Sequence, residues 1–153
     1  MVNTTERLTK AGIELPPAVT PFGPYVPALR IGNLLFLSGM LPTVGHAPKF
    51  VGHVGKELNV EQGCEAAHAA ALNALAVVQQ QLGSLDRVSR VVRLGVYIAA
   101  SGEVDLVKIA DAASEVLRDV FGNDKLPARL VFGVAGLPLG TPVELETIFE
   151  VAA

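Results

Sequence analysis

The clearest strand pattern in this chain is PARLVFGVAGLP at residues 127–138, followed by VELETIF at residues 143–149. Both segments alternate between two sets of side chains, as strands do because successive side chains point to opposite faces of a sheet. In the first segment, the more apolar set, which we expect to face the core, is Leu130, Phe132 and Val134. The set expected on the other face is Arg129, Val131 and Gly133.

The second segment alternates in the same way, and the Gly and Pro residues between the two segments predict a hairpin. Its core-facing set is Val143, Leu145 and Phe149. Its other set is Glu144, Glu146 and Ile148. The pattern therefore places one arginine and two carboxylates on the sheet face away from the core.

Hydrophobic periodicity and capping residues predict five further elements upstream. The expected strands are 28–31, 34–38 and 88–99, and the expected helices are 60–82, capped by Asn59, and 104–121, ended by Gly122. The order is ββαβαββ. Two amphipathic helices of this kind would cover one face of a single mixed sheet, which is an α+β fold of two layers.

Composition narrows the class of protein. The chain has 153 residues, of which 50% are hydrophobic and 18% charged, so it is expected to form one domain and to hide apolar surface in an oligomer. A net charge of −3 without a basic run disfavours nucleic-acid binding. The lone cysteine, Cys64, excludes an intramolecular disulfide framework, and without a signal core or an apolar span we expect a cytoplasmic protein.

Three motifs, in this order, resemble the RidA (YjgF/YER057c) family of enamine/imine deaminases. They are Gly23-Pro24-Tyr25; Gly32-Asn33 with Phe36-Leu37-Ser38-Gly39; and Ala128-Arg129 with Leu137-Pro138 and Val143-Glu144-Leu145-Glu146. The resemblance implies a RidA-like domain at 22–153 after an N-terminal extension at 1–21. It also implies a chorismate mutase-like fold that assembles as a homotrimer, with sites in the clefts between subunits.

The resemblance further implies a site for a small imine or enamine that carries a carboxylate. Arg129 would bind that carboxylate, since a guanidinium grips it through two hydrogen bonds and stays charged. Glu144 would orient or activate the attacking water, with Glu146 as the runner-up. Tyr25 would line the cleft and hydrogen-bond the substrate. The backbone N–H of Gly39 would contact the substrate or water, and two further residues would shape the wall, namely Ser38 and Val131.

The expected hairpin places Glu144 opposite Val134, so Arg129 would lie five residues further along its strand. At roughly 3.3 Å per residue this separation is about 16 Å, too far for one substrate-sized pocket. We therefore expect a site that spans two subunits.

Two departures from the family pattern bear on the substrate. Leu130-Val131 stands where the family usually has Ser-Cys, and no Phe-Asn-like pair is found around residues 108–111. Both leave open the side chain of the substrate and whether turnover occurs.

No metal or organic cofactor is expected, because the three histidines, His46, His53 and His68, lack the spacing of a metal motif. Two alternatives to a deaminase remain: a non-catalytic regulatory trimer that binds a small acid, and an endoribonuclease-like relative, which the low charge and 5% aromatic content disfavour. The roles of the N-terminal extension and of the loop that carries His46 and His53 are open.

Overall fold

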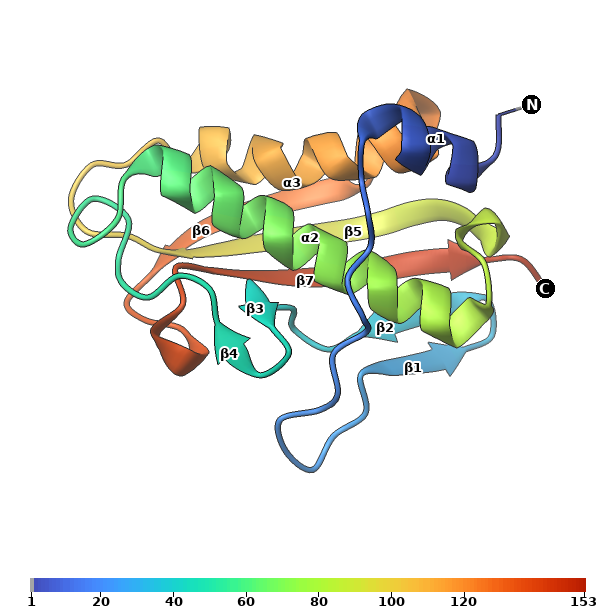
Figure 1. Cartoon of the computed structure of the whole chain (residues 1–153), viewed down its shortest axis with the longest axis horizontal. Helices are drawn as coiled ribbons and strands as arrows, with labels where there is room; N and C mark the ends of the chain where they lie inside the picture. The colour runs from blue at the N-terminus through green and yellow to red at the C-terminus, as the bar shows by residue number, and fades with distance from the viewer. Residues whose placement is uncertain (1) are drawn as a thin grey trace.

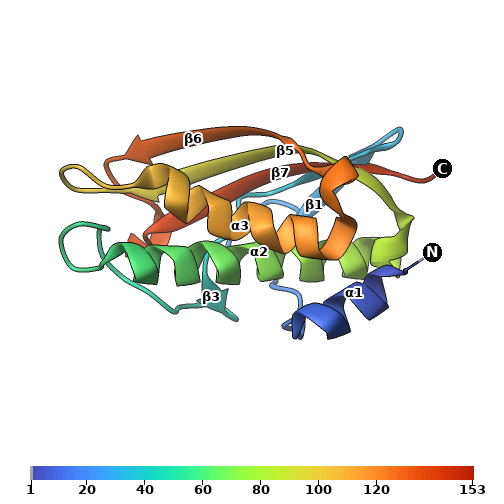
Figure 2. The same ribbon diagram turned by 90° about the horizontal axis from the view of Figure 1, so that it is seen from above.

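Two helices cover one face of a five-stranded mixed sheet, which confirms the predicted α+β fold (Figures 1 and 2). The computed structural model describes residues 2–153. In the strand order β1-β2-β7-β5-β6, β5 and β6 pair in parallel and the other neighbours pair antiparallel. The strands are β1 (Ala28–Ile31), β2 (Leu34–Leu37), β5 (Val88–Ala99), β6 (Ala128–Val134) and β7 (Val143–Val151).

The helices begin and end at residues suited to their positions. In α2 (Val60–Leu82), Asn59 and Gln62 form a capping box, and Gly83 ends the helix in the left-handed conformation. Helix α3 (Leu106–Phe121) begins at its N-cap Asp105, slightly later than predicted. The side of α2 against the sheet is rich in alanine, which allows close approach; its buried alanines include Ala66, Ala67, Ala70, Ala71 and Ala74.

Helix α1 (Thr4–Ala11) lies outside this two-layer core and packs on α3 (Figure 2). Three single turns of 3₁₀ helix lie in the connections between these elements, at Leu85–Arg87, Asn123–Lys125 and Pro138–Gly140. Across residues 2–153, the structure contains no helix with the length and apolarity needed to span a membrane.

The segment between β2 and α2 contains a short hairpin, β3 (Thr43–Val44) with β4 (Ala47–Pro48), where the sequence predicts only a loop. Asn73, buried on α2, anchors this segment. Its side-chain amide donates to the carbonyls of Leu41 at 2.8 Å and Thr43 at 2.9 Å. This anchor fixes the chain just after Gly39.

The predicted hairpin of β6 with β7 is wrong. β6 pairs with β5, and β7 lies between β5 and β2, so β5 separates the two strands. The reason is that β5, α3 and β6 form a crossover unit, in which the helix carries the chain back so that β6 can pair in parallel with β5. This unit places β6 at the sheet edge and leaves the other side of β5 to β7.

The predicted facing of β6 is also wrong, whereas that of β7 is confirmed. Arg129 pairs with Leu94 of β5, which is fully buried under the helices, so Arg129 and Val131 face the helix side. Leu130 and Phe132 lie on the other side and are 39% and 51% exposed. Alternation separates two faces without saying which is the core, and here both faces carry apolar residues.

We call the sheet surface away from α2 and α3 the open face. Large exposed apolar side chains lie on it from both edges of the sheet; they are Leu29, Ile31, Phe36, Leu130 and Phe132. An apolar surface of this kind is typical of a protein interface. The predicted trimer stays a prediction, and this face is the natural candidate for its contact.

Candidate functional site

Gly39 and Glu144 are brought together by a backbone bridge between β7 and the residue after Gly39. The N–H of Met40 donates to the carbonyl of Leu145 at 2.8 Å, and the N–H of Leu145 donates back at 2.9 Å. A Cβ atom on Gly39 would lie 2.6 Å from Oε2 of Glu144, closer than real contacts allow. The missing side chain at position 39 is therefore what makes room for this carboxylate.

The proline-rich loop before β1 carries Tyr25 to the same place. The hydroxyl of Ser38 donates to the carbonyl of Val26 at 2.6 Å, and the N–H of Ser38 donates to Pro27 at 3.0 Å. Within the loop, the Tyr25 hydroxyl accepts the N–H of Phe22 at 3.1 Å. Ser38 thus holds the loop against the end of β2, and Tyr25 stays exposed beside it.

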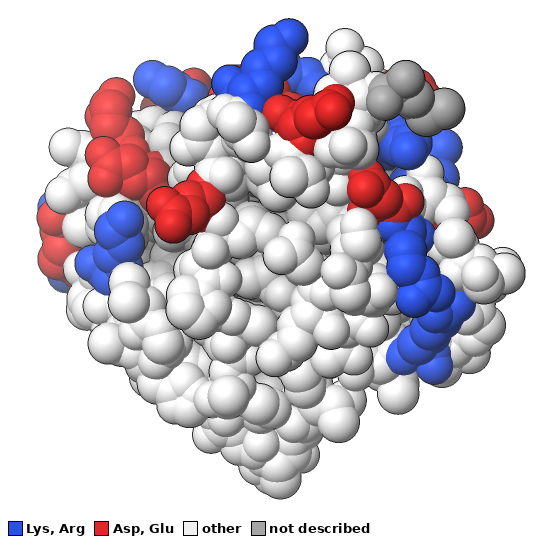
Figure 3. All heavy atoms as spheres, turned by 45° about the vertical axis from the view of Figure 1, so that its right-hand side comes forward, with Lys and Arg blue, Asp and Glu red and all other residues white. Residues whose placement is uncertain are grey.

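These residues surround an open hollow of about 460 Å³. The hollow is lined mainly by apolar groups, with few polar ones among them. The lining residues are Phe22, Tyr25, Ser38, Gly39, Leu41, Pro138, Leu139 and Glu144. On the face shown in Figure 3, charged groups lie across the upper part and down the right-hand edge, while the lower tip of the molecule is largely uncharged. Glu144 is the one charged residue in the lining of the hollow, so the hollow offers one carboxylate in mainly apolar surroundings.

Burial raises the pKa of the Glu144 carboxyl above its ordinary value of 4.5. Glu146 differs, because its carboxylate forms an ion pair with Arg93 at 3.0 Å on the open face. Of the two glutamates that the sequence offers, Glu144 is the one that lines the hollow. A raised pKa in a hollow is typical of an acid–base group.

The raised pKa has a consequence for stability. The folded chain holds the Glu144 proton more tightly than the unfolded chain, so this group's contribution to stability is complete below the ordinary pKa of 4.5 and is lost as pH rises through the higher folded pKa. Glu144→Gln removes this contribution. We expect the free energy of unfolding of the variant, minus that of wild type, to increase over that window; denaturant titrations at several pH values from about 4 to 7 measure it. A difference that is constant with pH would contradict the pKa shift.

Arg129 and Val131 do not join the hollow. Arg129, on the edge strand β6, donates through Nη1 to Asp111 Oδ1 at 2.7 Å and to Ser114 Oγ at 3.1 Å, both on α3. Val131 packs against the core under α3. The structure thus brings together four of the six predicted site residues, Tyr25, Ser38, Gly39 and Glu144.

The strand register gives the separation of Arg129 from Glu144. Arg129 pairs with Leu94 and Glu144 pairs with Tyr97. Two strand spacings across and three residues along the sheet correspond to about 14 Å between Cα atoms, and the two side chains lie on opposite faces. The hairpin on which the earlier estimate depended is wrong, but within one subunit the two groups are again too far apart to share a small substrate.

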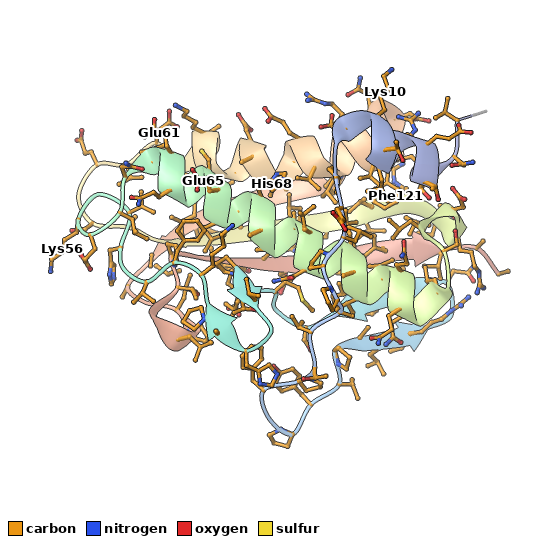
Figure 4. The ribbon with its side chains drawn as sticks, viewed as in Figure 1. Lys10, Lys56, Glu61, Glu65, His68 and Phe121 are labelled. Atoms are coloured by element: carbon orange, nitrogen blue, oxygen red, sulfur yellow. The ribbon has the colours of Figure 1, made fainter. Side chains whose placement is uncertain are left out.

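The three histidines lie apart from one another. His46 Nε2 lies 2.9 Å from the Thr20 hydroxyl, and His53 Nε2 lies 2.6 Å from the carbonyl of Ala135. His68 lies on α2 beside Glu65, near α3 (Figure 4). Within the described part of the chain, no group of three or more His, Cys, Asp or Glu side chains could hold a metal ion.

Cys64 has the character of a packing residue. It lies partly buried against the core, near the carbonyl of Lys108, and burial raises the pKa of its thiol. A raised pKa lowers the fraction of reactive thiolate.

Several residues that contact Arg129 or line the hollow were not predicted from the sequence. Asp111 and Ser114 stand one helical turn apart and therefore share a side of α3, a spacing that marks a joint contact without naming its partner. Phe22, Leu41 and Leu139 are apolar loop residues, and nothing in their sequence pattern distinguishes a hollow wall from a loop.

Residues 5–150 match the family model described as "YjgF/chorismate mutase-like, putative endoribonuclease". Protein TCP17 of Trypanosoma cruzi is 38% identical over 145 residues, which cover 94% of this chain and 91% of that protein. A 2-iminobutanoate/2-iminopropanoate deaminase of Dermatophagoides farinae is 31% identical and covers 89% and 92%.

The fold is shared as well. A crystal structure of an Agrobacterium tumefaciens protein of unknown function superposes with a TM-score of 0.88 at 34% identity, over 97% of this chain and 92% of that one. The sequence match, which covers nearly the whole chain, and the shared fold lead to one conclusion: this protein belongs to the YjgF family, the RidA family that its motifs resemble.

Proposed function

We propose that the protein hydrolyses 2-imino acids, formed directly or from their 2-enamino tautomers, to 2-oxo acids and ammonia. The observation that carries this proposal is the half-buried Glu144 carboxylate, whose pKa is raised, set against Gly39 in an apolar hollow. The relative from Dermatophagoides farinae that is named as an imine deaminase supports the same reaction.

The chemistry needs one group that exchanges a proton with water. Water attacks the C=N carbon, the carbon–nitrogen π pair moves to nitrogen, and Glu144 accepts the proton that water loses. Returning that proton to nitrogen gives a neutral carbinolamine. The proton of the carbinolamine hydroxyl then passes through Glu144 to the amino group, the C–N bond breaks with its electron pair on nitrogen, and the oxygen forms the C=O bond as ammonia leaves. The balance is one imine and one water giving one 2-oxo acid and one ammonia, and Glu144 ends as it began.

The substrate carboxylate would be bound by Arg129 of a second subunit. Within one subunit Arg129 and Glu144 are too far apart, as their register gives. Arg129 lies on an edge strand with its Nη1 held by α3, so its guanidinium is fixed in direction at the rim of the molecule. A trimer that packs through the apolar open face would bring such an edge to the hollow of the neighbouring copy.

The direct test is ammonia release from 2-iminopropanoate generated in place by an amino-acid oxidase. Wild-type protein is expected to accelerate the loss of the imine beyond its spontaneous rate in buffer, with one 2-oxo acid formed per ammonia. Decay at the buffer rate, both for this imine and for imines with larger side chains, would contradict the proposed function.

Gly39→Ala is expected to lower kcat/KM by about tenfold, because the new methyl group would displace the Glu144 carboxylate from its position. Steady-state kinetics with circular dichroism to monitor folding measure this loss. Gly136→Ala is the matched control, since a Cβ there meets nothing within 4 Å. Equal activity of the two variants would show that the position of Glu144 against Gly39 does not matter.

A further inference from the structure

The turn between β6 and β7 contains a leucine in a backbone conformation that leucine rarely adopts. Leu139 has φ 59° and ψ 12°, in the left-handed region, and within residues 2–153 no other non-glycine residue has a positive φ. Gly140 follows with φ 69°, and the N–H of Thr141 donates to the carbonyl of Pro138 at 3.2 Å. The geometry resembles a type I′ turn, whose first central position favours Asn, Asp or Gly.

The surroundings of the turn hold this conformation in place. The Thr141 hydroxyl, on a fully buried residue, donates to the carbonyl of Pro138 at 3.0 Å. The carbonyl of Gly140 accepts the N–H of Gly52 at 2.9 Å. Both anchors use atoms other than the Leu139 side chain, so the turn does not need a leucine in order to form.

Leu139 also gains little from burial, because it is 46% exposed. A residue that strains the backbone without filling the core is explained by something other than the fold. The position of Leu139 gives the explanation: it forms part of the wall of the hollow that holds Glu144, together with Phe22, Tyr25, Leu41 and Pro138.

We infer that Leu139 is a specificity-determining residue, and that the hollow takes 2-imino acids whose side chains are apolar and branched or aromatic. This inference rests on the proposed function for its reaction. The apolar wall would contact the substrate side chain while Glu144 acts on water at the imine carbon. A methyl side chain would leave Leu139 uncontacted, and a charged one would lose its water against it.

Leu139→Asn separates this role from a structural one, because asparagine tolerates the left-handed region and is polar. The variant is expected to lower kcat/KM about tenfold for the imine derived from leucine and less than twofold for the imine derived from alanine. Its thermal midpoint is expected to rise by about 3 °C, since the strain is relieved. Val107→Asn, at an exposed apolar residue of α3, is the control. Its kcat/KM is expected to match that of wild type for both imines.

A loss of stability in Leu139→Asn, or an equal loss of activity on both imines, would overturn the inference while leaving the proposed function intact. If wild type hydrolyses neither imine, the proposed function fails, and calorimetric binding of the two 2-oxo acids decides the inference separately. Tighter binding of 4-methyl-2-oxopentanoate than of pyruvate, abolished in Leu139→Asn, supports a selective apolar wall. Equal or absent binding of the two acids overturns it.

Discussion

Glu144→Gln is expected to lower kcat for imine hydrolysis by about a thousandfold, because it removes the proposed general base. The amide keeps the size of the carboxylate and its place beside Gly39, but it cannot accept a proton from the attacking water. The wild-type rate should depend on the same carboxylate. It is expected to fall as the medium is acidified through the raised pKa of Glu144, because the protonated carboxyl is no longer a base. Stopped-time ammonia assays with the imine generated in place measure both effects.

Glu146→Gln is the matched control for this substitution. The two glutamates lie on the same side of β7, but Glu146 pairs with Arg93 on the open face, where an exposed ion pair contributes at most about 1 kcal/mol to stability. We expect this variant to keep at least about half of the wild-type kcat. If it loses as much activity as Glu144→Gln, the assignment of the base to Glu144 is wrong.

Arg129→Ala is expected to raise KM by about a hundredfold, with a smaller decrease in kcat. The guanidinium would bind the substrate carboxylate through two charge-assisted hydrogen bonds, and alanine leaves that carboxylate without a partner. Arg129→Lys keeps the positive charge but cannot form the paired hydrogen bonds, so its KM should lie between those of wild type and Arg129→Ala. Initial rates over a range of imine concentration give the two constants separately.

Loss of the fold would not account for such an effect. The ion pair of Arg129 with Asp111 is partly exposed, so removing it should cost less than about 1 kcal/mol of stability. Arg118→Ala, which removes another partly exposed arginine near the end of α3, is the control and should leave KM unchanged. A normal KM in Arg129→Ala would contradict the proposed role of this arginine.

Most of the fold could be predicted from local signals in the sequence. The capping residue Asn59 and the terminal Gly83 bound α2 because their conformations are suited to helix ends, and the β-branched run at 88–99 predicts β5. The prediction that failed, the pairing of β6 with β7, concerns a non-local contact. The chain does turn between β6 and β7, but β6 pairs with β5 because of where α3 packs, and the residues of the turn give no information about that packing.

The candidate site shows the same division. Tyr25, Ser38, Gly39 and Glu144 come together as the motifs imply, because the bridge between Met40 and Leu145 joins their segments. The side of the sheet that Arg129 faces could not be read from alternation, since Leu130 and Phe132 make the open face apolar too. The place of Leu139 in the wall of the hollow could not be predicted for another reason. It depends on a strained turn that the local sequence does not favour.

Each active site is expected to use Glu144 of one subunit and Arg129 of another. The most direct measurement mixes the two impaired variants, Glu144→Gln and Arg129→Ala, by joint refolding. The mixture is assayed for imine hydrolysis at an imine concentration below the wild-type KM, where each variant alone is expected to be nearly inactive. If the site is shared, random assembly forms intact pairs at about one quarter of the sites of a closed symmetric oligomer, so activity should return to about that fraction of wild type. A mixture as inactive as either parent, when wild type refolded in the same way is active, would contradict the account.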